Sequence, residues 1–93
     1  MSSRRELMTY VTVRYWAAAK QAAGVAEETL DADTLAGAIA AALARRGHDP
    51  RLRAVLDRSS FLVDGSAVGR GGTEEVVLPE AAVIEVLPPF AGG

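Results

Sequence analysis

The side chains that most often carry chemistry in proteins are few in this chain. It contains no cysteine and one histidine, His48, which argues against a thiol nucleophile, a disulfide or a closed zinc site. His48 follows a glycine suited to a helix end, where we interpret it as a surface or capping residue. The serines have no histidine base in a plausible relation, so nucleophilic serine chemistry is not expected. No catalytic constellation of side chains is visible.

Two other polar features also lack the pattern of an active site. Glu27-Glu28 and Glu74-Glu75 are adjacent carboxylates, but neighbours in a strand point to opposite faces, so neither pair converges on one substrate. The run Gly69-Arg70-Gly71-Gly72 lacks the spacing and the following Lys-Ser/Thr of a phosphate-binding P-loop. We interpret this run as a flexible turn.

The remaining candidate is the terminal segment Pro88-Pro89-Phe90-Ala91-Gly92-Gly93. The two prolines fix φ at about −65° and keep the exit extended. A segment without Cβ atoms can lie in a narrow channel of a partner that side chains would block. The group it delivers is the α-carboxylate of Gly93, ionised at neutral pH with a reference pKa of roughly 3.5. We therefore expect the reactive group to be on the main chain.

A carboxylate is a poor acyl donor until a partner enzyme activates it. Adenylation with ATP gives an acyl-adenylate with a good leaving group, and a sulfide equivalent that displaces AMP leaves a thiocarboxylate. A protein without cysteine can carry reactive sulfur in this way. We expect no bound cofactor, because the activating partner uses the ATP.

Alternating and periodic patterns predict the elements that support this segment. Thr9–Tyr15, Glu27–Asp31 and Val83–Leu87 are predicted strands, the first and last being the most apolar. Asp64-Gly65 is a turn pair after a further short strand, Phe61 to Val63. We interpret the alanine-rich stretch from Trp16 to Ala23 as a connection with at most one helical turn.

One long helix is predicted between the second and third strands. Thr34 is its N-cap, and Leu35, Ile39 and Leu43 recur every four residues as an apolar stripe. Gly47 suits the left-handed position that ends a helix. Pro50 is predicted to open a second, shorter helix.

This order of elements predicts an α+β fold of the β-grasp, or ubiquitin-like, kind. We expect a mixed sheet of four to five strands with one main helix packed across it, the first and last strands being parallel neighbours in the centre. Residues 1–8 are expected to be a flexible leader, residues 9–88 the domain and residues 89–93 an extended tail. A chain of 93 residues fits one domain.

Charge and hydropathy limit the classes of partner that we expect for this chain. Ten basic and twelve acidic residues give a formal charge of −2, and no basic stripe for nucleic acid is present. We interpret the arginines near residues 45–58 as the solvated end of a helix. The longest apolar stretch is too short to span a bilayer. We expect a cytoplasmic protein that binds neither nucleic acid nor membrane.

Three stretches resemble the small subunit of molybdopterin synthase, a ubiquitin-like sulfur carrier of the MoaD/ThiS-like kind. They are the ending VIEVLPPFAGG (Val83 to Gly93), the opening VTVRYWAAAKQAAG (Val11 to Gly24) and the helix start at Thr34-Leu35. The resemblance covers nearly the whole chain from about Thr9 onward. The turn before the last strand, Pro79 to Val83, departs from the Asp-Gly-Asp-Glu-Val usual in the family.

The resemblance implies two partners and a role for each tail residue. A ubiquitin-activating-like adenylyltransferase would adenylate Gly93, and the thiocarboxylated tail would enter the large catalytic subunit of molybdopterin synthase, where a pterin precursor receives the sulfur. Gly93 would carry the sulfur, with Gly92 and Ala91 as its slim neighbours and Phe90 and Pro89 as docking contacts. The chain would then be a sulfur carrier and not itself an enzyme.

Alternatives remain open from the sequence. The same carrier mechanism serves thiamine and cysteine biosynthesis, although the double proline favours molybdenum cofactor biosynthesis. A protein modifier conjugated through Gly93 to lysines would use the same terminus. A binding module with an inert tail is a further alternative.

Overall fold

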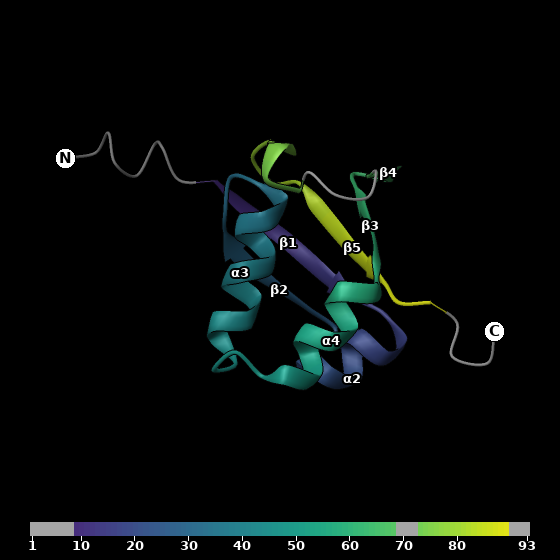
Figure 1. Ribbon diagram of the computed structural model, residues 1–93. Coiled ribbons are helices and arrows are strands. Elements are labelled where there is room, and N and C mark those ends of the chain that lie inside the picture. Colours follow the sequence, from purple (N-terminus) through teal and green to yellow (C-terminus); the bar gives the residue numbers. More distant parts are fainter. Residues whose placement is uncertain (1–8, 69–72, 90–93) are drawn as a thin grey trace.

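A mixed sheet with helices on one face forms the framework of the protein in a computed structural model that describes residues 9–68 and 73–89. In Figure 1, α3 crosses the sheet, while α2 and α4 lie together near the end of β1 and β5. The strands are β1 (Tyr10–Tyr15), β2 (Glu27–Asp31), β3 (Ser60–Val63), β4 (Ser66–Ala67) and β5 (Val83–Leu87). The helices are α2 (Ala17–Ala23), α3 (Leu35–Arg45), α4 (Pro50–Arg58) and the 3₁₀ turn η1 (Thr73–Glu75).

The strand order confirms the predicted β-grasp arrangement. The five strands follow the order β2-β1-β5-β3-β4. The first and last strands are parallel neighbours, with Tyr15 opposite Val86, while β2 and β3 run antiparallel to them. Because parallel strands end on the same side, the end of β1 and the end of β5 lie together.

The core lies between the sheet and the helices. Alternate residues of β1 and β5 point toward α3 and are almost fully buried, as strand periodicity requires. The predicted apolar stripe of α3 packs against them, although Ile39 keeps partial exposure. The buried residues of these elements and α4 are Val11, Val13, Tyr15, Leu35, Ala38, Ala42, Leu43, Leu52, Leu56, Ile84 and Val86.

The predicted ends of α3 are present. The hydroxyl of Thr34 accepts a hydrogen bond from the backbone N–H of Gly37 at 3.0 Å, which satisfies one of the unpaired donors of the first turn. At the other end Gly47 has φ +62°, the conformation for which glycine carries no steric penalty.

The structure differs from the sequence-based interpretation before β2. The stretch expected to be a connection forms α2, a seven-residue helix that begins after Trp16 and is closed by Gly24 with φ +84°. Its small side chains allow close packing, and Ala19 and Ala23 are buried. The predicted second helix is α4, with Pro50 in its first turn and Asp49 as its cap.

Some predicted features lie outside the described residues. They are the leader, residues 1–8, and the turn at residues 69–72. Among the described helices, none has the length and apolar character needed to cross a bilayer.

Candidate functional site at the base of the tail

The structure describes the base of the tail and not its tip. Pro89 lies just beyond β5 and is exposed, and Pro88 before it is partly buried. The other predicted site residues lie outside the described residues; they are Phe90, Ala91, Gly92 and Gly93. The geometry available is therefore that of the support from which these residues continue.

The tail begins where β5 ends, and β5 is an inner strand that is hydrogen-bonded to β1 on one side and to β3 on the other. On one side, the backbone N–H of Trp16 donates to the carbonyl of Val86 at 3.3 Å, just past the β1–β5 ladder. On the other side, Leu87 is the last β5 residue paired with β3, opposite Ser60. Two ladders thus fix the chain up to the residue before Pro88.

Trp16 lies beside this base with an oriented side chain. Its indole Nε1–H donates to Oε1 of Glu85 at 3.1 Å, and the backbone contact to Val86 fixes the same residue from its main chain. Trp16 nevertheless remains 47% exposed. A large aromatic side chain is therefore oriented at the surface by Glu85, which lies two residues before Leu87 in β5.

Trp16 and Glu85 lie on the face of the sheet that α3 does not cover. This face carries both apolar and charged side chains. In β5, the residues that alternate with the buried Ile84 and Val86 are Val83, Glu85 and Leu87, and all three are partly buried. Leu62 of β3 stands opposite Glu85. Strand alternation could have indicated these outward positions from sequence, but Trp16 as a partner of Glu85 was not predicted.

Charges on this face are unevenly matched. Arg14 is the β1 residue opposite Glu85, but its guanidinium pairs instead with Glu27 of β2 at 3.3 Å. Within residues 9–68 and 73–89, no lysine, arginine or histidine forms an ion pair with Glu85. The side chain of Glu85 is therefore held by the indole N–H of Trp16, and Arg14 lies opposite it in register without forming an ion pair with it.

A buried ionic network braces the covered face at the same end of β1. Tyr15 donates its hydroxyl hydrogen to Glu28, and Arg45 and Arg46 each donate to Oε1 of that carboxylate at 2.9 Å. The Glu28 side chain is only 8% exposed. Arg46 also lies over the Tyr15 ring, 5.6 Å from its centre. The network joins β1, β2 and α3.

The network shifts the pKa values of its members. Burial by itself raises the pKa of Glu28, but the hydrogen bonds from Arg46, Tyr15 and Arg45 outweigh it and hold that pKa below its ordinary value. Burial, followed by the hydrogen bond to Glu28 and its charge, raises the pKa of Tyr15. At neutral pH Glu28 is therefore ionised and the hydroxyl of Tyr15 keeps its proton.

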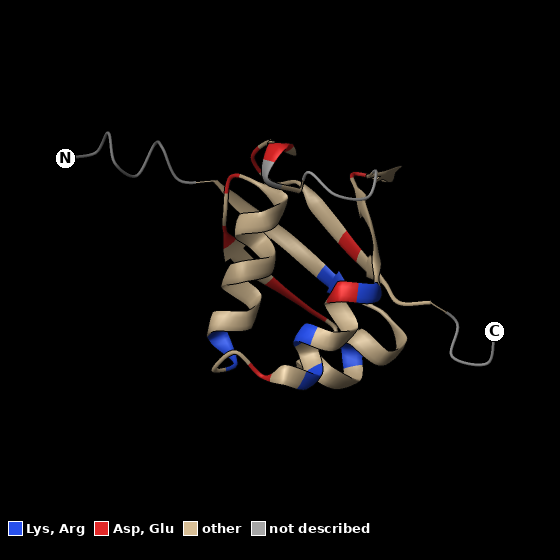
Figure 2. Ribbon diagram, in the orientation of Figure 1, with Lys and Arg blue, Asp and Glu red and all other residues tan. Residues whose placement is uncertain are grey.

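The interpretation of the arginines as a solvated helix end is wrong for Arg46. Its side chain is only 15% exposed, and besides Glu28 it donates to the carbonyls of Ala23 and Ala42 at 2.8 Å. These bonds do satisfy helix-end carbonyls, as the dipole argument suggested. Of the other described arginines, Arg45 lies in α3, three lie in α4 and Arg14 lies in β1; the blue segments of Figure 2 mark these positions together with Lys20.

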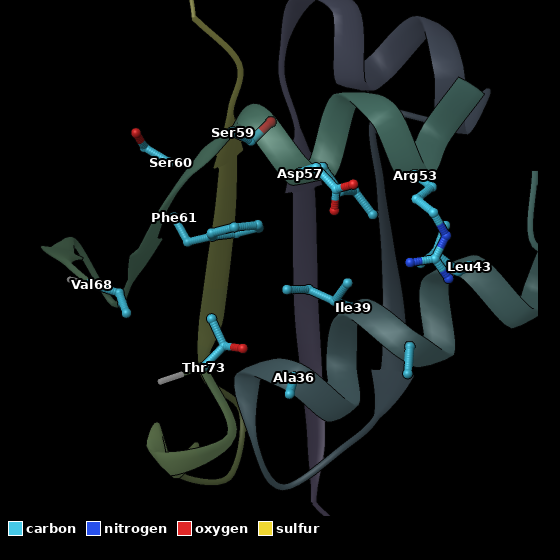
Figure 3. Close-up of a pocket in the computed structure, with 12 residues that line it drawn as sticks. Ala36, Ile39, Leu43, Arg53, Asp57, Ser59, Ser60, Phe61, Val68 and Thr73 are labelled. Carbon is cyan, nitrogen blue, oxygen red and sulfur yellow. The ribbon is translucent and has the colours of Figure 1, made fainter. Parts of the chain in front are cut away.

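The part of the chain that the structure describes contains no cluster of potential metal ligands. A hollow of about 380 Å³ between α3, α4 and β3 has Ile39 and Phe61 pointing into it (Figure 3). The hydroxyl of Ser59, which lines the hollow, donates to the carbonyl of Val55 and is therefore not paired with a base. The base of the tail therefore remains the candidate site.

Comparison with protein family models gave one match. The family model described as the ThiS family matches residues 13–93, which include the second half of β1, all later elements and the tail. Comparison with curated protein sequences gave no match.

Solved structures show the same fold. Small archaeal modifier protein 1 (SAMP1) from Methanosarcina acetivorans superposes with a TM-score of 0.76 at 22% identity, covering 92% of this chain and 98% of that chain. A putative molybdopterin converting factor subunit 1 from Pyrococcus furiosus gives 0.69 at 21% identity, covering 87% and 98%. A complex of subunits 1 and 2 of the molybdopterin-converting factor from Helicobacter pylori gives 0.62 at 21%, covering 91% and 100%.

Proposed function

Because this chain belongs to the ThiS family of small ubiquitin-like sulfur carriers, we propose that its working group is the α-carboxylate of Gly93, carried by the tail beyond β5. The observation that carries the proposal is the base of this tail. It leaves an inner strand held by β1 and β3 and continues at once into Pro88-Pro89. A firm base and a stiff exit restrict where the tip can go, which lowers the entropy lost when a partner's channel takes it up.

The proposed reaction has three steps, with partners supplying the catalysis. An adenylyltransferase of the ubiquitin-activating kind joins the Gly93 carboxylate to the AMP of ATP and releases pyrophosphate. A sulfide equivalent then attacks the acyl carbon and displaces AMP, which leaves a thiocarboxylate. The thiocarboxylate sulfur passes to an acceptor, and water restores the carboxylate oxygen.

The proposed acceptor is a pterin precursor in molybdenum cofactor biosynthesis, with this chain as the small subunit of molybdopterin synthase. The Pro-Pro-Phe-Ala-Gly-Gly ending and the structural likeness to a molybdopterin-converting factor complex support this pathway. The large catalytic subunit of that synthase is then the second partner. Thiamine or cysteine biosynthesis would use the same carrier chemistry with another acceptor.

A second candidate is conjugation of Gly93 to lysines of other proteins. The likeness to small archaeal modifier protein 1 favours it. Both candidates share the acyl-adenylate, so they diverge only in the nucleophile that attacks it: sulfide for the carrier, a lysine amine for the modifier.

The test uses the full chain, ATP, a sulfide source and a purified adenylyltransferase of the ubiquitin-activating class from the same organism. Intact-mass spectrometry is expected to show one oxygen replaced by sulfur at the C-terminus. Deletion of Gly93 should abolish the change while circular dichroism stays native, and Val77→Ser, at an exposed site far from the tail, should leave it intact. Full modification of the deletion variant would disprove the proposal, and ladders on other proteins would favour the modifier.

A further inference from the structure

The hollow between α3, α4 and β3 leaves apolar surface at the edge of the core uncovered by the described residues. Its volume is about 380 Å³, which lies in the range of sites that take up a ligand. The side chains of Ile39 and Phe61 point into it (Figure 3), and both are only partly buried although they pack against the core. An apolar group placed in the hollow would remove this surface from water, which is favourable.

Two charged side chains of α4 line the same hollow. Arg53 and Asp57 lie one helical turn apart and project from α4 toward α3 (Figure 3). Among residues 9–68 and 73–89, neither side chain has a hydrogen-bond or ion-pair partner. An occupant that suits the hollow therefore has an apolar side chain, an anionic group for Arg53 and an N–H donor for Asp57.

The tail begins next to this hollow. Ser60, which lines the hollow, is paired with Leu87, the last residue of β5, and α4 ends two residues before Ser60. A chain that runs from there beside α4, toward the beginning of that helix, meets Asp57 first and Arg53 one turn later. Residues 88–93 span at most about 20 Å when extended. This exceeds the length of α4, which is about 14 Å for its nine residues.

Three segments of the chain lie outside the described residues, and the tail alone combines these properties. Residues 69–72 connect two lining residues of the hollow, but they are three glycines and an arginine and have no apolar side chain. Residues 1–8 precede β1, which is parallel to β5, so they join the sheet at the end opposite to the tail. Residues 90–93 offer the ring of Phe90, main-chain N–H groups and the carboxylate of Gly93.

We propose that the tail of the free protein docks in this hollow of its own domain, with the Phe90 ring against the apolar floor and the Gly93 carboxylate paired with Arg53. A main-chain N–H of the tail donates to Asp57. Docking withdraws the carboxylate from partners, so an activating enzyme binds only the undocked fraction and its apparent affinity falls in proportion. The docking stands on the hollow itself, whereas this regulatory consequence rests on the proposed function.

The first experiment detects the docked tail by NMR spectroscopy of the full chain with labelled methyl groups. Nuclear Overhauser effects are expected between the ring of Phe90 and the methyl groups of Ile39. The chain has two phenylalanines, so the signals that Phe90→Leu removes are those of Phe90. The same variant should shift the methyl signals of Ile39 and leave those of Val77, an exposed residue that does not line the hollow, unchanged.

The second experiment measures pyrophosphate exchange by the purified adenylyltransferase as the concentration of this chain is varied. Arg53→Gln removes the cation, and Ala40→Glu adds a carboxylate at an exposed position that lines the hollow. Both should release the tail and lower KM by about two- to fivefold with kcat nearly unchanged. Arg51→Gln and Ala54→Glu make the same changes at exposed positions of α4 outside the hollow, and they should leave KM unchanged.

Circular dichroism melts establish that each variant is folded. A higher KM for Arg53→Gln than for wild type would overturn the proposal, because the hollow would then receive a partner and not the tail. Unchanged KM in both hollow variants, equal shifts in the controls, or no contact between Phe90 and Ile39 would also overturn it. If that contact is present but wild type shows no Gly93-dependent exchange, the proposed function fails and the docking stands.

Discussion

The hydroxyl group of Tyr15 donates a hydrogen bond to the carboxylate of Glu28 and so joins the last residue of β1 to β2 on the covered face of the sheet. Tyr15 is nearly fully buried, while Trp16, the next residue, is exposed beside the tail. The ionic network thus braces the strand end that Trp16 directly follows. The end of β1 therefore carries both a buried network and an exposed aromatic ring beside the base of the tail.

Tyr15→Phe should lower the free energy of unfolding by about 1 to 2 kcal/mol at neutral pH. The variant keeps the buried ring but removes a hydrogen bond to a charged acceptor, and the two arginines still bind Glu28. Urea denaturation followed by circular dichroism measures the difference. A change within about 0.5 kcal/mol, typical of surface substitutions, would mean that the hydroxyl contributes nothing net.

The pKa of Tyr15, raised by burial and then by Glu28, adds an alkaline signature to this prediction. Because the folded pKa lies above the unfolded value of about 10, the stabilisation is complete below about pH 10 and is lost as the pH rises beyond it. Wild type should therefore lose stability above about pH 10 more steeply than Tyr15→Phe. Parallel losses in the two proteins would contradict the prediction.

Glu28→Gln should lower the free energy of unfolding by about 3 kcal/mol at pH 7, because it leaves the mostly buried guanidinium of Arg46 without its counterion. The pKa of Glu28 is held below its ordinary value despite burial. Its stabilisation is therefore present above the unfolded pKa of about 4.3 and lost as the pH falls through the folded pKa. The difference between variant and wild type should shrink in acid below about pH 4.

Glu27→Gln is the matched control, since Glu27 is the adjacent carboxylate and also pairs with an arginine. Its side chain is 57% exposed and that of Arg14 is 50% exposed, so the pair is screened by solvent and the change should stay within about 1 kcal/mol. Equal losses for the two glutamates would show that burial of the network is unimportant.

Strand and cap positions were predicted well because their causes are local. Glu27–Asp31 and Val83–Leu87 have the predicted bounds, since alternation and flanking turn residues mark them. Thr34 and Gly47 were recognised because capping and positive φ each favour few residue types. Helix α2 was underestimated because its alanines give no apolar stripe, and tertiary packing decides its state.

Contacts between distant residues were not predictable. The hydrogen bond from Trp16 to Glu85 joins residues 69 positions apart, and that from Arg46 to Glu28 spans 18. Each arises only when β1 lies between β2 and β5 and α3 lies across them. The sequence therefore led to the tail as the proposed reactive segment, while the contacts around its base could be found only from the fold.

Leu43→Ala should lower the free energy of unfolding by roughly 2 to 5 kcal/mol, the cost of removing buried methyl groups and leaving a cavity. Leu43 is 3% exposed on the face of α3 that packs into the core. Val77→Ala, at a site 74% exposed, is the control and should change stability by less than about 0.5 kcal/mol. A negligible shift of the denaturation midpoint for Leu43→Ala would mean that this stripe faces solvent.

Replacing Pro88 and Pro89 together by glycine tests whether stiffness at the base of the tail assists activation. Each proline restricts the free chain by an amount corresponding to about 0.4 to 1 kcal/mol, so the double variant should raise the KM for pyrophosphate exchange by roughly 4- to 30-fold. Because both residues follow the last ladder pair of β5, the fold should be unaffected and kcat should change little.

Pro79→Gly provides the control for this double variant. Pro79 is exposed and lies in the turn before β5, at the opposite end of that strand from the tail. Its replacement relaxes the backbone without touching the exit, so KM should remain at the wild-type value even if the melting temperature falls. An unchanged KM in the Pro88 and Pro89 double variant would show that partners order the tail at no measurable cost, and that the firmness of its base, not the stiffness of its first residues, governs presentation.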